Sequence, residues 1–246
     1  MFKRIVIKLS GEALSEDSVN IFDNQKISEI VSDILKVKNK GVEISLVLGG
    51  GNILRGRSVS SETDRTKADQ IGMLATVINS IYLADMIRQQ GGLAVVMTPF
   101  KIGTFTLEFS KDLALEYFKK GYIIIFAGGT GHPFFSTDTI PALRAAELSA
   151  DCVFYAKNVD GVYDKNPSVH SDAKRYKEIT YRKIIKDNLV ANDLAAMILC
   201  EDNNIPSLVF SLKYPNSIVL AAENDERLYE FGTKLLNHNE EDYHVK

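Results

Sequence analysis

Short apolar runs alternate with longer segments of helical periodicity along the chain. Several of the runs are apolar throughout and rich in β-branched residues, which is typical of strands covered on both faces. Between the first two runs, Ile27, Ile30, Val31, Ile34 and Leu35 keep the i, i+3, i+4, i+7, i+8 spacing of a helix with one buried face. The predicted strands are Arg4–Leu9, Glu43–Leu48, Leu93–Met97, Tyr122–Phe126, Cys152–Ala156, Ser207–Phe210 and Ser217–Leu220. The alternation predicts an α/β fold with a mostly parallel sheet and helices on both faces.

The segment Lys67–Gln90 has apolar residues around most of a helical circumference. Such a helix is buried either in a core or at a subunit interface, and the pattern leaves both alternatives open. We expect part of it to lie at an interface between copies of the chain. No internal repeat or low-complexity linker divides the sequence, so we expect one domain over residues 1–246. The polar residues Asn237–Lys246 predict a frayed tail.

Composition narrows the class of protein. The chain has 246 residues, 45% of them hydrophobic and 25% charged, which is ordinary for a globular enzyme-sized domain. A net charge of −3 provides no basic field to attract nucleic acid. Cys152 and Cys200 lie in apolar runs and predict small buried side chains rather than a disulfide framework. No signal-peptide pattern or apolar run of about 20 residues is visible, so we expect no membrane association and a cytoplasmic protein.

Three glycine clusters follow predicted strands. Gly11 comes after the first strand, Gly49–Gly51 after the second, and Gly128–Gly131 after the strand that ends at Phe126. Ligands of open parallel sheets bind at the carboxyl ends of the strands. Glycine lets backbone N–H groups approach phosphate oxygens closely because no Cβ intervenes. Any one cluster is compatible with an ordinary tight turn, but three at matching strand ends indicate a phosphate-binding site.

The familiar nucleotide motifs are missing. There is no GxxxxGK[ST] loop, because Lys8 precedes its glycine and no lysine directly follows the later clusters. There is no GxGxxG that opens a helix, and the HRD and DFG elements of protein kinases are absent. The phosphate cradle is therefore of another kind.

Phosphoryl transfer needs cations, and carboxylates that orient them or hold a metal. Lys8 at the end of the first strand and Arg55 after the triple glycine are the candidate cations, with a solvated surface charge as the alternative for each. The candidate carboxylates are Asp138, Asp69 and Asp193. Each precedes or begins a helical pattern, so helix capping or stabilisation of the helix dipole is the alternative role for all three. None of the four histidines completes a triad.

Several motifs, in order along nearly the whole chain, resemble those of the bacterial uridylate (UMP) kinases in the amino-acid-kinase superfamily. They are Lys8–Leu14 (KLSGEAL), Gly49–Asn52, Arg55-Gly56, Asp69–Thr76 (DQIGMLAT), Gly129–Asp138 (GTGHPFFSTD) and Val159–Tyr163 (VDGVY). The stretch Gly129–Asp138 is the most specific of them. Carbamate, acetylglutamate and aspartate kinases share the lysine–glycine start, but not this stretch together with DxxGMLAT.

The resemblance implies a three-layer αβα sandwich with about eight strands, mainly parallel. It also implies transfer of the γ-phosphoryl group of Mg-ATP to UMP in pyrimidine nucleotide biosynthesis, and assembly as a homohexamer. The Mg²⁺ is expected on the nucleotide phosphates, with no direct protein ligand. UTP inhibition is implied by the family alone. Activation by GTP stays open, because Ser15–Asp23 lacks the glycines of the family's effector segment.

The family's functional residues carry over by motif. Lys8, Arg55 and Asp138 are the implied catalytic residues, and we expect Asp193, a candidate from its position before a helical pattern, to join them. The implied ATP-binding residues are Lys8, Leu9, Ser10, Gly11, Gly51, Arg55, Lys157, Asn158, Tyr163 and Asn166. The implied UMP-binding residues are Gly50, Asp69, Thr130, Gly131, His132, Pro133, Phe134, Phe135, Ser136 and Thr137.

Besides the missing glycines in Ser15–Asp23, the chain departs from the family at three places. His132 stands where the family often has asparagine, and Asn166 where it has an acidic residue before the proline. The run around Lys157 and Asn158 is one residue shorter than in some members, which leaves open which of the two contacts ATP. Two alternative functions also remain at this stage: another small-molecule kinase of the superfamily, or a non-catalytic nucleotide- or oxyanion-binding protein on the same fold.

Overall fold

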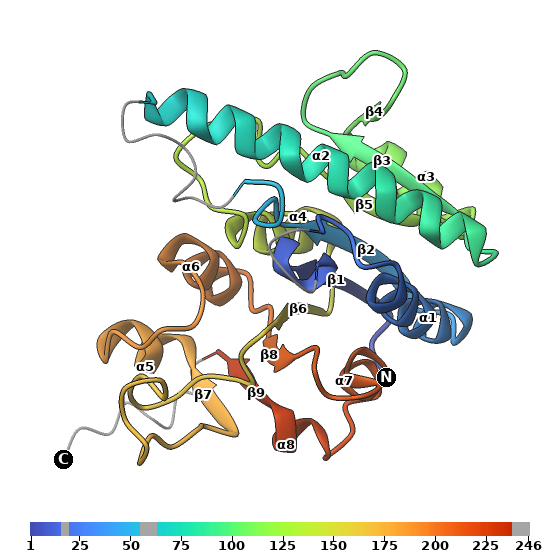
Figure 1. The fold of residues 1–246 in the computed structure, drawn as a ribbon. Helices are drawn as coiled ribbons and strands as arrows, with labels where there is room; N and C mark the ends of the chain where they lie inside the picture. Colours follow the sequence, from blue (N-terminus) through green and yellow to red (C-terminus); the bar gives the residue numbers. More distant parts are fainter. Residues whose placement is uncertain (16–19, 55–62, 238–246) are drawn as a thin grey trace.

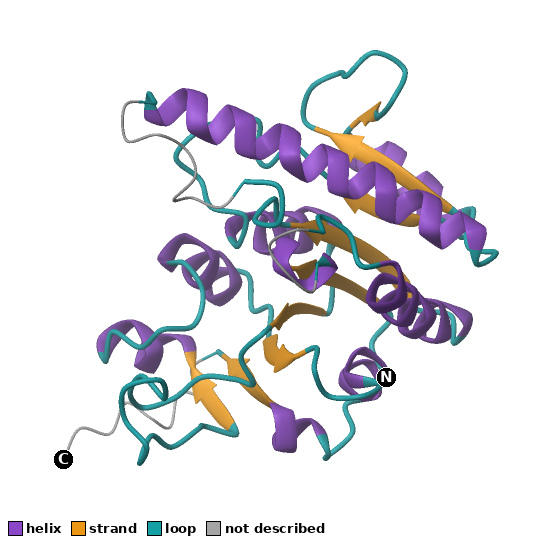
Figure 2. Cartoon of the chain, in the orientation of Figure 1, coloured by secondary structure: helices purple, strands orange, loops and turns teal. Residues whose placement is uncertain are grey.

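The computed structural model describes residues 1–15, 20–54 and 63–237. Within them, one mixed sheet has the strand order β4-β3-β5-β2-β1-β6-β8-β9-β7, and helices cover both of its faces (Figures 1 and 2). The strands are β1 (Arg4–Leu9), β2 (Glu43–Leu48), β3 (Ala94–Thr98), β4 (Leu107–Glu108), β5 (Ile123–Phe126), β6 (Cys152–Lys157), β7 (Glu178–Thr180), β8 (Ser207–Ser211) and β9 (Gly232–Leu236). The helices are η1 (Gly11–Leu14), α1 (Asn24–Asn39), α2 (Arg65–Gln89), α3 (Lys111–Lys119), α4 (Thr139–Leu148), α5 (Tyr181–Lys186), α6 (Leu194–Asp202), α7 (Ser217–Glu223) and α8 (Leu228–Phe231). Neighbouring strands are parallel except β8 and β9.

Two hydrophobic cores separate the sheet from its helix layers. One core joins the sheet to α1, α2, α7 and α8, and the other joins it to α3, α4, α5 and α6. Side chains alternate between the two cores along each strand, so Ile5 and Ile7 of β1 face the first core and Val6 faces the second. The predicted three-layer αβα sandwich with a mainly parallel sheet is confirmed.

Local signals explain where the two long helices begin. Asp23 caps α1, its carboxylate accepting from the N–H groups of Gln25 and Lys26. Asp64 caps α2 by accepting from the N–H of Lys67. Among the described residues, α2 is the one helix long and apolar enough to cross a membrane, although no continuous apolar run marked it in the sequence. Half of its apolar window is buried inside the protein, so by length and composition alone the helix is weak evidence for a membrane span.

The strand predicted at Ser217–Leu220 is wrong, because these residues begin α7. The β-branched pair Ile218 and Val219 favoured a strand, and a short apolar run has too few residues to show its period. Ile218 instead packs into the core shared with α1. The position beside β8 is occupied by β9, which the sequence analysis did not identify, nor did it identify the short β4 and β7.

The two cysteines are free and buried, in agreement with the sequence analysis. Asn237 is held beside α6, because its amide group donates to the carbonyl of Glu201. The rest of the predicted tail, 238–246, lies outside the described residues.

Candidate active site

The three glycine clusters meet at one edge of the sheet. Their strands β1, β2 and β5 are neighbours, so the loops that follow them emerge side by side (Figure 1). The N–H of Gly49 donates to the carbonyl of Leu9 at 2.9 Å. A Cβ on Gly11 would come within 2.6 Å of the Gly51 nitrogen and 2.8 Å of the Gly49 carbonyl oxygen. The first two loops are therefore in direct backbone contact, which only glycine at position 11 allows.

A buried cluster of three charges lies beside these loops. Lys8 of β1 is opposite Tyr155 of β6, so Lys8 and Lys157 are two positions apart in register and point to the same face. Asp138 lies between them at the start of α4: its two carboxylate oxygens are 2.9 Å from Lys8 Nζ and 3.1 Å from Lys157 Nζ. Lys157 also donates to the carbonyl of Ala191 at 2.7 Å. The three side chains are only 11–18% exposed.

Burial and ion pairing act in opposite directions on this cluster. Burial alone would raise the pKa of Asp138, but the ammonium groups of Lys8 and Lys157 outweigh it and hold the pKa below its usual value. Burial lowers the pKa of Lys157, and Asp138 only partly offsets that effect. Two lysine side chains thus share a single carboxylate, so cationic groups outnumber acidic ones in this cluster beside the glycine loops.

The helix-cap alternative is wrong for Asp138 and correct for Asp193. Asp138 occupies the N-cap position of α4, but its side chain makes no capping hydrogen bond and instead faces the lysines. Asp193 caps α6 by accepting from the N–H of Ala196 at 2.6 Å. Its other oxygen accepts from the hydroxyls of Ser136 and, at 2.8 Å, Thr139. Asp193 thus joins α6 to the Gly129–Asp138 loop, and its catalytic role stays a prediction.

A pocket of about 340 Å³ opens between the second and third glycine loops and the start of α2. Its lining includes many of the residues implied for UMP: Gly50, Asp69, Thr130, Phe135, Ser136 and Thr137, together with Gly51. The other residues of that set occupy the same loop. His132 donates its N–H to the Thr130 hydroxyl, and the ring of Phe134 is exposed. Gly131 and Pro133 complete the turn without lining the pocket.

Asp69 is not a first-turn acid of α2, because it is the fifth residue of that helix. Its carboxylate accepts from the N–H of Phe134 at 2.8 Å and from Nε of Arg65 at 3.0 Å. The buried hydroxyl of Thr76 accepts from the N–H of Gly128 at 2.9 Å. The α2 helix therefore holds the segment that begins with the third glycine cluster at two points, the N–H of Gly128 and the N–H of Phe134.

Six lining residues were not predicted as site residues in the sequence analysis, and all but the first of them lie on α2: Leu54, Arg65, Ala68, Gly72, Met73 and Thr76. Helical spacing was the available signal. Residues at positions 65, 69, 72, 73 and 76 recur at intervals of three and four, so they share the face of α2 on which Asp69 lies. The sequence analysis considered the apolar pattern of this helix, and that pattern does not show the polar residues on the same face.

The residues implied for ATP extend from the first loop toward the end of β6. The hydroxyl oxygen of Ser10 is buried and has no hydrogen-bond partner among the described residues. Asn158 is exposed, and its amide group is 3.4 Å from a carboxylate oxygen of Glu12. Tyr163 donates its hydroxyl to Asp160, and Asn166 accepts from the N–H of Ser168. Arg55 lies outside the described residues.

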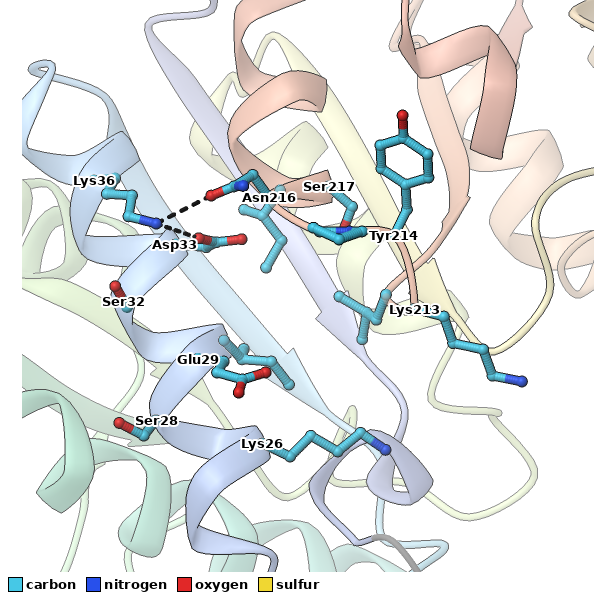
Figure 3. A pocket seen from close by; sticks show the side chains of 14 residues that line it. Lys26, Ser28, Glu29, Ser32, Asp33, Lys36, Lys213, Tyr214, Asn216 and Ser217 are labelled. Carbon is cyan, nitrogen blue, oxygen red and sulfur yellow. Dashed lines mark hydrogen bonds and ion pairs between the residues drawn. The ribbon is translucent and has the colours of Figure 1, made fainter.

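A second hollow, of about 530 Å³, lies between α1 and the loop that follows β8 (Figure 3). Lys36 bridges it, with hydrogen bonds to Asp33 and Asn216. Lys26, Lys213 and Tyr214 also line it. None of the catalytic or nucleotide-binding residues predicted from the sequence lines it.

The comparisons with known proteins agree with this geometry. The sequence profile described as the amino acid kinase family matches residues 3–211. The crystal structure of UMP kinase from Ureaplasma parvum is similar, with 36% identity and a TM-score of 0.90 over 96% of this chain and 99% of that one. UMP kinase from Bacillus anthracis shares 34% identity, with a TM-score of 0.92 over 97% of each chain. Uridylate kinase from Archaeoglobus fulgidus shares 26%, with a TM-score of 0.70 over 94% of this chain and 99% of that one.

Proposed function

The chain belongs to the amino acid kinase family, and we propose that it is a UMP kinase, which transfers the γ-phosphoryl group of ATP reversibly to UMP to give UDP and ADP. One observation carries this proposal: the buried Lys8–Asp138–Lys157 cluster lies between backbone loops suited to phosphates and a separate pocket lined by Asp69 and Ser136. A phosphotransferase needs such a junction between two sites. We propose a single amino-acid-kinase-like domain over residues 1–246.

On the donor side, we propose that Lys8, Leu9, Ser10, Gly11 and Gly51 hold the ATP phosphates, with Arg55 from outside the described residues. The unpartnered Ser10 hydroxyl supports this assignment, because a buried polar atom without a partner costs free energy unless a ligand satisfies it. Lys157 is directed at Asp138, whereas Asn158 is exposed beside the first loop. We therefore assign the outer nucleotide contact to Asn158, with Tyr163 and Asn166, and place Lys157 at the reacting phosphoryl group.

On the acceptor side, we propose that UMP occupies the 340 Å³ pocket. Asp69 accepts from a sugar hydroxyl, Gly50 approaches the nucleotide through its backbone, and the loop Thr130–Thr137 surrounds the base and phosphate. His132 belongs to this loop but does not line the pocket. Its effect on UMP binding therefore comes from the conformation of the loop rather than from a direct contact. Phosphate and sugar are thus recognised by groups that come from two different segments.

Transfer in this site is in line and needs no covalent intermediate, because holding both nucleotides in position supplies most of the rate acceleration. Lys8, Lys157 and Arg55 neutralise the charge on the moving phosphoryl group, and Asp138 fixes the positions of the two lysines. Both oxygens of Asp138 face ammonium groups, and the described residues contain no group of three or more His, Cys, Asp or Glu side chains that could bind a metal. Mg²⁺ therefore fits on the ATP phosphates, where it supplies further charge neutralisation.

The test is ADP release from ATP and Mg²⁺ with UMP, CMP, dCMP, carbamate and N-acetylglutamate as acceptors. We expect turnover with UMP and none with carbamate or N-acetylglutamate. Turnover with carbamate but not UMP would place the chain among the other small-molecule kinases of the family. Tight nucleotide binding without turnover of any acceptor would make it a binding protein.

The lowered pKa of Lys157 predicts the alkaline limb of the pH profile. Lys157 acts as a cation, so its contribution is lost as the pH rises through its folded-state pKa, which lies below that of an exposed lysine. We expect kcat/KM to fall with pH in the alkaline range. In Lys157→Arg the limb moves to higher pH, because a guanidinium stays charged. Both proteins use the same substrates, so substrate ionisation cancels in the comparison. Identical alkaline limbs would show that Lys157 does not act as a charge.

We propose that α2 forms an interface between copies of the chain, in a homohexamer. Four apolar residues on it, Ile71, Leu74, Ile78 and Ile81, are 39–51% exposed and recur at intervals of three, four and three, the spacing of a helix–helix seam. An exposed stripe of this kind marks a protein contact.

Sedimentation tests the interface. The double variant Leu74→Glu/Ile78→Glu is expected to sediment as a smaller species at micromolar concentration, while Gln89→Glu, which adds charge near the end of the same helix, keeps the wild-type size. A wild-type monomer would contradict the proposal.

We also propose a cytoplasmic location, a place in pyrimidine nucleotide synthesis and inhibition by UTP. Whether GTP activates is a question for the ADP-release assay, since residues 16–19 of the segment Ser15–Asp23 lie outside the described residues.

A further inference from the structure

Three side chains form a clasp between the start of α2 and the third glycine loop. Arg65 donates from Nε to both carboxylate oxygens of Asp69, at 3.0 Å each. Its guanidinium carbon is 5.6 Å from the centre of the Phe134 ring, within the range of a cation–π contact. The N–H of Phe134 donates to Asp69 at 2.8 Å. Each member of the clasp therefore contacts both of the others.

The clasp acts on a strained part of the loop. Phe134 has a φ of 72°, in the left-handed region that a bulky side chain rarely adopts. Its ring is 67% exposed, so core packing does not hold this conformation. The next residues, Phe135, Ser136 and Thr137, line the acceptor pocket. A shift at Phe134 would move that wall of the pocket directly.

We infer that Arg65 is a positioning residue that sets the acceptor pocket and its preference for a ribose over a 2′-deoxyribose, an inference that rests on the proposed UMP kinase function. One oxygen of Asp69 accepts from both Phe134 and Arg65, whereas the other accepts from Arg65 alone and keeps lone-pair capacity for a sugar hydroxyl. The Nε–H of Arg65, shared between the two oxygens, holds the carboxylate in this orientation. Arg65 also lines the pocket and is the one cation among its described lining residues.

A simpler interpretation treats Arg65 and Asp69 as an ordinary i, i+4 surface ion pair, which contributes little. The two interpretations differ for Arg65→Lys. Lysine keeps a positive charge beside Asp69 but loses the planar group that binds two oxygens and stacks on the ring. The surface-pair interpretation predicts wild-type kinetics for this variant, and the clasp predicts an altered acceptor site.

The experiment is steady-state kinetics with UMP and dUMP at saturating ATP. In Arg65→Met we expect KM for UMP to rise about tenfold, kcat to stay within about twofold, and the UMP-to-dUMP ratio of kcat/KM to fall about tenfold. Arg65→Lys should show a smaller change in the same direction. Arg227→Met is the matched control, because Arg227 makes a similar exposed pair with Asp225 far from the pocket, and it should behave as wild type.

A double-mutant cycle with Phe134→Leu completes the test. If Arg65 acts through the ring and loop, the effects of Arg65→Met and Phe134→Leu on KM are less than additive. Unchanged KM and unchanged ribose preference in Arg65→Met would overturn the inference, as would a loss confined to kcat. Melting curves identify a variant that fails to fold, and Arg65→Lys then decides the question. Failure of the wild type to phosphorylate UMP would instead refute the proposed function, and the inference with it.

Discussion

Asp138→Asn is expected to lower kcat by about 10²–10³-fold while KM for UMP changes little. The substitution keeps the size of the side chain but removes the charge that both lysines share. An asparagine can accept from one ammonium group, but its amide nitrogen would then face the other. Lys8 and Lys157 would repel each other and leave the positions in which they meet the moving phosphoryl group. The loss therefore belongs to the chemical step rather than to acceptor binding.

Initial rates with UMP and ATP check this expectation, with a melting curve to show that the variant folds. Asp33→Asn is a suitable control, because Asp33 is an equally buried carboxylate that pairs with the exposed Lys36 in an i, i+3 contact on α1, and neither residue lines the acceptor pocket. A folded Asp138→Asn protein with wild-type kcat would remove Asp138 from the mechanism. A rise in KM with unchanged kcat would move it to the UMP pocket.

The same carboxylate links activity to stability at low pH. Its pKa is held below the usual carboxyl range in the folded protein, so the stabilisation is present at neutral pH and is lost as the pH falls through the folded-state pKa. Asp138→Asn should therefore flatten part of the acid dependence of the melting temperature. Burial and ion pairing oppose each other here, and the sign of the shift shows that ion pairing prevails.

Local pattern was enough to predict most of the central sheet. Six of the predicted strands, from Arg4–Leu9 through Ser207–Phe210, overlap observed strands in the interior of the sheet, because strands buried on both faces are continuous apolar runs. The same reasoning failed at Ser217–Leu220, because a short apolar run is compatible with a strand or a helix. These residues begin the helix α7, which packs against α1. The edge strands β4 and β7 have two and three residues, too few for any periodicity.

In the candidate site, too, the sequence predicts the local features but not the contacts between distant segments. Glycines at strand ends are local features, and the topology brings them together as expected. The pairing of Lys157 with Asp138 depends on the register of β6 beside β1, and on the position of α4, neither of which a single sequence displays. The clasp of Arg65 on Phe134 joins segments about 70 residues apart. It also depends on a left-handed backbone conformation at Phe134, which a proline-phenylalanine sequence does not predict.

Gly11→Ala is expected to cost about 1–3 kcal/mol of folding free energy and to lower kcat/KM by about 100-fold. The added Cβ would lie 2.6 Å from the backbone nitrogen of Gly51 and 2.8 Å from the carbonyl oxygen of Gly49. Backbone atoms cannot rotate away as a side chain can, so the first two loops must separate, and both hold the proposed phosphate site. Gly51→Ala is the matched control for stability, since among the described residues its Cβ would meet Glu12 Cγ alone, at 3.8 Å, an ordinary contact. Denaturant unfolding and initial rates measure the two effects. A Gly11→Ala protein as stable as Gly51→Ala and as active as the wild type would show that the close approach of the two loops is dispensable, and with it the proposed cradle.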